Sequence, residues 1–150
     1  YNKIHQEKLW KQRKKKIEEG LRTITWYKDE ARKPFQAWIR LVRDVNNNCI
    51  SCGCTTAKQW HGGHYKKAEI YSGVIFHPDN VHKQCSRCNK DLHGNELNYR
   101  EGLIKKIGAE RVESLEQLAN KTRYHPYTIE DLEIIKQQYK SKLIEAGFKP

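Results

Sequence analysis

Residues 49–95 read CISCGCTTAKQWHGGHYKKAEIYSGVIFHPDNVHKQCSRCNKDLHGN and contain the residues from which the core of the fold is predicted. It contains two Cys-x-x-Cys pairs, Cys49/Cys52 and Cys85/Cys88. A gap of two residues lets both sulfurs of one turn reach the same ion, so four such thiolates are typical of one tetrahedral structural Zn²⁺. Two disulfides or buried free cysteines are the alternative, although nothing marks the chain as a small secreted protein.

The stretch is predicted to fold as a ββα unit that the zinc holds together. A strand is expected near Gln59–Tyr65, a loop over Lys66–Asp79, a second strand over Val81–Gln84 and a helix from Cys88 towards His93. Gly94 can end that helix. Cys54 is a fifth cysteine, either a spare ligand or a packing residue. The expected fold class is therefore α+β and mainly helical, with a zinc-bound ββα core between flanking helices.

The flanking sequence divides into three further segments. Residues 1–24 are polar and basic, with KQRKKK at 11–16, and predict a helical extension whose partner is another chain, another domain or DNA; a frayed terminus is the alternative. Residues 25–48 predict an amphipathic helix over Thr25–Val45 that packs on the core and is ended by the run of asparagines at 46–48. Residues 96–150 predict helices over Glu96–Ile107, Ala109–Ala119 and Thr128–Ala146. Thr128 and Asp131 resemble a capping box at the start of the last helix.

The helix predicted within residues 25–48 is indicated by a stripe of aromatic and aliphatic residues. Phe35, Trp38, Ile39 and Val42 fall at i, i+3, i+4 and i+7, which places them on one helix face. Such a stripe is more typical of core packing than of a binding surface. Pro34 is expected at the first turn of the helix or at a kink.

The charge balance indicates the class of partner. The chain has 150 residues with 29 Lys plus Arg against 18 Asp plus Glu, a net charge of +11. An excess of this size favours a polyanion, nucleic acid first, with a solvated basic surface as the alternative. No apolar run is long enough to span a membrane and no signal peptide is visible, so we expect a cytoplasmic protein of the host cell.

The order Cys-x-x-Cys, His, Asn, Cys-x-x-Cys-Asn resembles the HNH endonucleases, whose site is a β-hairpin followed by a helix. A closer resemblance is to the phage recombination family NinG, also called Rap. It rests on CISCG (49–53), QWHGGHY (59–65), DNVHKQC (79–85), CNKDLHGN (88–95) and NYREGLIKKIG (98–108), and covers roughly Cys49 to Leu118. The resemblance implies a metal-dependent endonuclease that cleaves branched DNA, such as Holliday junctions and D-loops, in phage or prophage recombination.

The resemblance also implies roles for particular residues. His64 matches the general base, and an imidazole that titrates near neutral pH suits that role; a structural histidine is the alternative. Asn80 matches the residue that ties down the loop beside the base, although Asp-Asn is also an ordinary turn. Asn89 and His93, at i and i+4, match ligands of a catalytic Mg²⁺ or Mn²⁺; a capping Asn and a surface His are the alternative.

One position departs from the family pattern. Many HNH enzymes have a metal-binding Asp or His immediately before the base, where this chain has Gly63. His61 is the nearest available ligand, and the flexible Gly62 and Gly63 allow the backbone to bring it to the metal. His61 is alternatively a DNA contact or a residue that supports a ligand.

Basic side chains near the expected site are candidates for phosphate contacts. They are Lys66, Lys67, Lys83, Arg87, Lys90, Arg100, Lys105 and Lys106. A second hypothesis is a zinc module without catalytic activity that binds branched DNA or scaffolds a recombination complex. For an enzyme, symmetric cutting of a junction favours a homodimer.

Overall fold

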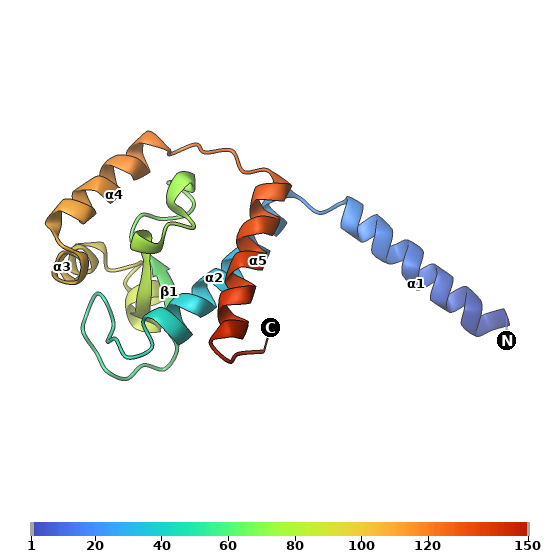
Figure 1. Cartoon of the computed structure of the whole chain (residues 1–150), viewed down its shortest axis with the longest axis horizontal. Coiled ribbons are helices and arrows are strands. Elements are labelled where there is room, and N and C mark those ends of the chain that lie inside the picture. The colour runs from blue at the N-terminus through green and yellow to red at the C-terminus, as the bar shows by residue number, and fades with distance from the viewer. Residues whose placement is uncertain (1, 150) are drawn as a thin grey trace.

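The computed structural model describes residues 2–149 and shows a mainly helical α+β fold with one two-stranded antiparallel sheet (Figure 1). Tyr1 and Pro150 lie outside the described residues, so the start of the extension predicted from residue 1 does too. The elements are α1 (Asn2–Gly20), α2 (Ile24–Trp38), η1 (Ile39–Arg43), β1 (Trp60–His64), η2 (Ser72–Val74), η3 (Pro78–Asn80), β2 (Val81–Cys85), η4 (Arg87–Asp91), α3 (Glu96–Ile107), α4 (Ala109–Lys121) and α5 (Ile129–Glu145).

Helix α2 begins at Ile24 because Thr23 caps it, its side chain accepting a hydrogen bond from the Trp26 backbone N–H at 3.3 Å. Pro34 lies in the helix interior, so its expected place in the first turn is wrong. The helix continues into the π-helical turn η1 and does not stay α-helical to Val45. At the other end of the chain, Thr128 and Asp131 form the predicted capping box of α5.

The aromatic stripe of α2 is part of the core. Phe35 and Ile39 are fully buried and pack with Val81 of β2 and Tyr139 of α5. The rings of Phe35 and Tyr139 lie 4.8 Å apart, edge to face. Helix α5 therefore packs along α2, as Figure 1 shows, and residues of both helices contact one side of the hairpin at Val81.

A second core lies on the other side of the hairpin, under helices α3 and α4. Its centre is formed by Tyr65, Val74, Tyr99, Leu103 and Leu115. The hydroxyl of Tyr99 donates a hydrogen bond of 2.7 Å to the Gly63 carbonyl, which links α3 directly to strand β1. Core residues thus pack against the hairpin from two sides.

Strands β1 and β2 pair in antiparallel register, with Trp60 opposite Cys85 and His64 opposite Val81. The expected helix after the second strand is a single π-helical turn, η4, which ends at Asp91 and does not reach His93. The reason is local, because His93, Gly94 and Asn95 all have left-handed backbone conformations. His93 therefore lies outside the helix, and the expected shared helix face of Asn89 and His93 is wrong.

A buried charge joins η1, β2 and α3. The carboxylate of Asp44 accepts hydrogen bonds from Arg43 and Lys106 and from the Lys83 backbone N–H. Burial alone would raise the pKa of Asp44, but the bonds from the two cations hold it well below its ordinary value. This ion cluster fixes where the chain leaves η1 and enters the loop of Cys49.

Helix α1 projects away from the rest of the molecule, joined to it through residues 21–23 (Figure 1). None of its residues is buried. In the described part of the chain, no helix combines the length and the apolar character needed to cross a membrane.

Candidate functional site

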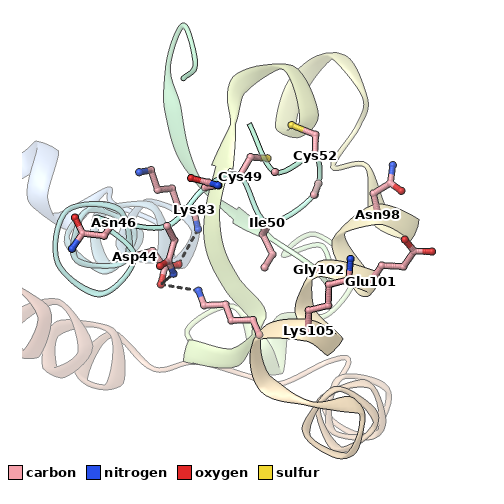
Figure 2. Close-up of a pocket in the computed structure, with 15 residues that line it drawn as sticks. Asp44, Asn46, Cys49, Ile50, Cys52, Lys83, Asn98, Glu101, Gly102 and Lys105 are labelled. Carbon is pink, nitrogen blue, oxygen red and sulfur yellow. Dashed lines mark hydrogen bonds and ion pairs between the residues drawn. The ribbon is translucent and has the colours of Figure 1, made fainter. Parts of the chain in front are cut away.

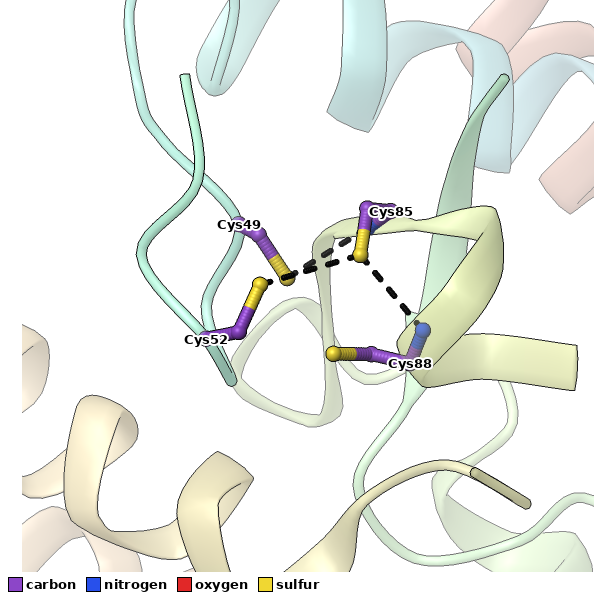
Figure 3. Close-up of side chains that lie close together, drawn as sticks. All are labelled: Cys49, Cys52, Cys85 and Cys88. Atoms are coloured by element: carbon purple, nitrogen blue, oxygen red, sulfur yellow. Dashed lines mark hydrogen bonds between the residues drawn. The ribbon is translucent and has the colours of Figure 1, made fainter. Parts of the chain in front are cut away.

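The four predicted cysteines come together in the fold. Their sulfur atoms all lie within 4.8 Å of one another, and Cys52 and Cys85 Sγ are 3.8 Å apart (Figure 3). A tetrahedron with metal–sulfur bonds of about 2.3 Å has edges of about 3.8 Å, so the cluster has the size that Zn²⁺ requires. All five cysteines are free, which removes the disulfide alternative. Cys49, Cys52, Cys85 and Cys88 can therefore hold a metal such as zinc.

The surroundings of the cluster suit thiolates. The Cys85 backbone N–H points at Cys49 Sγ and the Cys88 backbone N–H at Cys85 Sγ, each at 3.4 Å, and Asn95 Nδ2 lies 3.4 Å from Cys88 Sγ. Donors of this kind orient metal ligands and offset their negative charge. Cys54 is not in the cluster and packs beside it, partly buried.

A polar pocket of about 400 Å³ opens where α2 and η1 pass over strand β1. The predicted residues His61, His64 and Asn89 line it together with Arg32, Gln36 and Arg40. The last three were not predicted, although their spacing of i, i+4 and i+8 on the face of α2 and η1 beside the buried stripe is visible in the sequence.

His64 stands at the end of β1 with a defined tautomer. Its Nε2 lies 2.9 Å from the carbonyl oxygen of Ile75, and a carbonyl only accepts, so Nε2 carries the hydrogen. Nδ1 then keeps its lone pair. Burial lowers the pKa of His64 to about 4, so the ring is neutral at pH 7. The titration near neutral pH that was expected of this histidine is therefore not found, and the ring is a weaker base than a free imidazole. Its unprotonated Nδ1 is nevertheless the nitrogen that can accept a proton from water.

Asn80 is fully buried and holds the loop that follows His64. Its Oδ1 accepts a hydrogen bond from the Lys66 backbone N–H at 2.7 Å, and its Nδ2 donates to the Lys66 and Val74 carbonyls at 3.0 Å. The side chain thus ties both ends of the loop between His64 and Ile75 to the start of β2. These contacts fix the carbonyl that sets the tautomer of His64.

His61 and Asn89 form a pair across the pocket, with Asn89 Nδ2 placed 2.9 Å from His61 Nδ1. His61 Nε2 is buried and has no hydrogen-bond partner among the described residues. Burial and the nearby Lys90 and Arg40 lower the pKa of His61, so the ring is neutral at pH 7. Because the Asn89 amide nitrogen only donates, Nδ1 of the neutral ring accepts and Nε2 carries the hydrogen. The buried Nε2–H therefore suits an acceptor such as a phosphate oxygen, and it would bind a metal ion only in the other tautomer.

His93 lines an adjoining pocket of about 340 Å³, which it shares with His64, Asn89, Lys67 and Lys90. The structure therefore brings all three predicted ligands of the catalytic cation around His64, but at two pockets that meet at Asn89. Within residues 2–149 the histidines do not form a cluster as tight as that of the cysteines.

Gly63, the departure from the HNH pattern, has a steric cause. A Cβ added at this position would overlap the side-chain oxygen of Gln84, the residue opposite His61 in the sheet. Gln84 is fully buried and donates to Ser51 Oγ at 2.8 Å and to the Gly94 carbonyl at 2.7 Å. The Gln84 side chain therefore fills the space that a side chain at position 63 would need. This role of Gln84 was not predicted from the sequence.

The predicted phosphate contacts fall into groups and do not form one surface. Lys67 and Lys90 lie at the His64 pockets, whereas Lys66 and Arg100 pair with Glu96 and Glu116. Arg87 lies on the outer side of the cysteine cluster.

The other three predicted contacts, Lys83, Lys105 and Lys106, line a groove of about 570 Å³ between the Cys49 loop and α3 (Figure 2). Lys106 is held there by Asp44, and Lys83 Nζ lies over the Trp60 ring. Basic residues that lie close together in the sequence are thus at several separate positions in the fold.

Comparisons with known proteins agree on one family. The family model described as bacteriophage lambda NinG protein matches residues 2–147. The proteins named ninG from Escherichia phage lambda, Escherichia phage 933W and Salmonella phage P22 are 38%, 37% and 36% identical to the chain over 124 residues. The matches cover 83% of this chain and 59%, 60% and 59% of those relatives, so the chain spans about three fifths of their length. No solved structure matches the chain.

Proposed function

The chain belongs to the bacteriophage lambda NinG family, and from this membership and the pocket around His64 we propose that it is a metal-dependent endonuclease of the HNH type. Its substrate in this proposal is branched DNA, such as Holliday junctions and D-loops, cut during phage recombination in the cytoplasm of the host. Structural Zn²⁺ at the four cysteines holds the hairpin and η4 together.

The observation that carries the proposal is the state of His64. The bond from Nε2–H to the Ile75 carbonyl leaves Nδ1 unprotonated, and burial keeps the ring neutral at pH 7. In the proposed reaction His64 accepts a proton from the attacking water, which makes the water a better nucleophile. Asn80 positions this base through the loop that carries Ile75.

The donor set near His64 suits a hard divalent cation. The imidazoles of His61 and His93 and the side-chain oxygen of Asn89 line the two pockets beside His64. These residues would hold Mg²⁺ or Mn²⁺, which when bound supplies stabilisation of the leaving oxyanion. A few mixed ligands leave room for water and phosphate oxygens.

The positive side chains around the pocket suit a phosphodiester. Arg32 and Arg40 line the side formed by α2 and η1, and Lys67 and Lys90 line the side formed by the loop and η4. Guanidinium and ammonium groups contact phosphate oxygens without reading the base sequence. This arrangement fits recognition of DNA by its shape.

A zinc module without catalytic activity is the second candidate. It is favoured by one observation, that the histidines do not form a compact ligand cluster within residues 2–149. In this case the chain would bind branched DNA or scaffold a recombination complex, and the pocket of His64 would have no chemical task.

Nicking of a labelled four-way junction in a titration of Mg²⁺ or Mn²⁺ separates the two candidates. The wild-type chain should cut, and Asn89→Ala should need a higher metal concentration, because it loses a ligand and not the base. His125→Ala is the matched control, since His125 is exposed and lies outside both pockets. Junction binding by zinc-loaded protein without cutting at any metal concentration would favour the non-catalytic module.

A further inference from the structure

Helix α1 is the part of the chain that the proposed site leaves unexplained. Its 19 residues include seven basic and three acidic ones, a net charge of +4 on one short segment of a chain whose net charge is +11. Between residues 8 and 16 there are six basic side chains and no acidic one: Lys8, Lys11, Arg13, Lys14, Lys15 and Lys16.

The exposure of α1 is unusual for a helix of this length. No residue of α1 is buried, and Ile4, Trp10 and Ile17 are 75%, 63% and 63% exposed. Most helices in proteins draw their stability from packing of an apolar face, and an isolated helix of about this length is marginal in water. A helix that is polar on all sides either bridges to a partner or depends on i, i+4 pairs, of which Lys14 and Glu18 form one at 3.9 Å.

Three of the basic residues of α1 share one face of the helix. Lys8, Lys11 and Lys15 are spaced i, i+3 and i+7, so they lie along one face, where they line a shallow depression together with Ile4, Gln12 and a single acidic residue, Glu7. The helix is about 28 Å long. Duplex DNA carries about one negative charge per 1.7 Å of its axis, so this face matches a duplex in both sign and reach.

We propose that α1 is a DNA-binding arm that lies along a duplex arm of the branched substrate, outside the His64 pocket, through the face of Lys8, Lys11 and Lys15. The proposal rests on the proposed function for the nature of the substrate. It adds a second place of contact, joined to the domain by the short segment of residues 21–23. The duplex arm would thereby be held at a distance from the scissile phosphate.

A second copy of the chain is the competing partner. Trp10 and Ile17 are exposed on one side of the helix, Leu21 follows directly after its end, and a coiled coil could cover all three. Lys14 also lies on this side, with its Nζ 5.5 Å from the Trp10 ring. Two copies packed there would bring the basic runs of both helices together, a repulsion that a DNA partner turns into attraction.

The test measures the affinity of the zinc-loaded 150-residue chain for a fluorescent four-way junction from 50 to 200 mM NaCl, with Ca²⁺ in place of Mg²⁺ or Mn²⁺. Lys11→Gln/Lys15→Gln should lower the slope of log affinity against log salt by about 1.8, because two phosphate contacts of about 0.9 each are lost. The control Lys121→Gln/Lys149→Gln removes the same charge from exposed positions elsewhere and should change the slope by less than about 0.4.

A second variant keeps every basic residue and breaks the helix. Gln12→Pro should weaken junction binding by about tenfold while the melting temperature of the rest of the protein stays unchanged, because no residue of α1 is buried. The proposal would be overturned by equal salt slopes for the two double variants or by wild-type affinity of Gln12→Pro. It would also be overturned by a concentration-dependent dimer that Gln12→Pro abolishes while the salt slope stays unchanged. Binding is read without cleavage, so this result stands apart from whether the His64 pocket cuts DNA.

Discussion

Asn80→Ala tests whether one buried amide holds the loop beside His64. The side chain is fully buried and makes three hydrogen bonds, two with the backbone of Lys66 and one with Val74. At about 0.5–1.5 kcal/mol net for each bond, the variant should lose about 2–4 kcal/mol of unfolding free energy. The loss of the three bonds should also free the loop that carries the Ile75 carbonyl.

Urea unfolding of zinc-loaded protein, followed by circular dichroism, measures this loss. Asn47→Ala is the matched control, because Asn47 is exposed and its amide lies 3.4 Å from Asp44, so less than about 0.5 kcal/mol should be lost. Asn80→Asp keeps the acceptor for the Lys66 N–H but turns a carboxylate oxygen towards two carbonyls, so it should be at least as unstable as Asn80→Ala at pH 7. A loss below about 1 kcal/mol for Asn80→Ala, with zinc retained, would show that the reasoning is wrong.

Three further outcomes follow from the fold. Cys85→Ser should lose the bound metal and unfold the hairpin and η4, which a zinc count and proteolysis would detect; a folded variant with full zinc would contradict the cluster. Gly63→Ala should destabilise the protein by about 1–3 kcal/mol in thermal melts, because Cβ meets the Gln84 side chain, and Gln84→Ala in the same chain should remove most of this penalty. Burial, then Lys106 and Arg43, lower the pKa of His82 to about 3 from an ordinary value near 6.5, so the unfolded chain binds a proton first as the pH falls. Between pH 7 and pH 5 the unfolding free energy of wild type should therefore fall by about 2 kcal/mol more than that of His82→Asn. Parallel pH profiles of the two proteins would count against this.

The parts of the fold that the sequence predicts are those with local causes. The two Cys-x-x-Cys turns form the cluster because each pair is fixed by its own turn, and the stripe of Phe35 and Ile39 is buried because helix period alone sets its face. The start of α5 follows from the residues of its capping box, Thr128 and Asp131.

The rest depends on contacts between distant segments. Arg32 and Arg40 line the pocket only because α2 crosses strand β1, and no local pattern shows that crossing. His93 was expected on a helix because i, i+4 spacing assumes that the helix continues, whereas left-handed residues end it at Asp91. The role of Gln84 could not be predicted because its side chain fills the space beside Gly63, a glycine on the other strand.

The most direct test of the central proposal is the single-turnover rate at which zinc-loaded wild type and His64→Ala cut a four-way junction in Mg²⁺ or Mn²⁺. We expect His64→Ala to bind the junction as wild type does and to cut it about 10²–10⁴-fold more slowly, because only the proton acceptor is lost. Raising the metal concentration should not restore the rate. Cleavage by His64→Ala at the wild-type rate, with the zinc content unchanged, would contradict the assignment of this pocket as the site of hydrolysis.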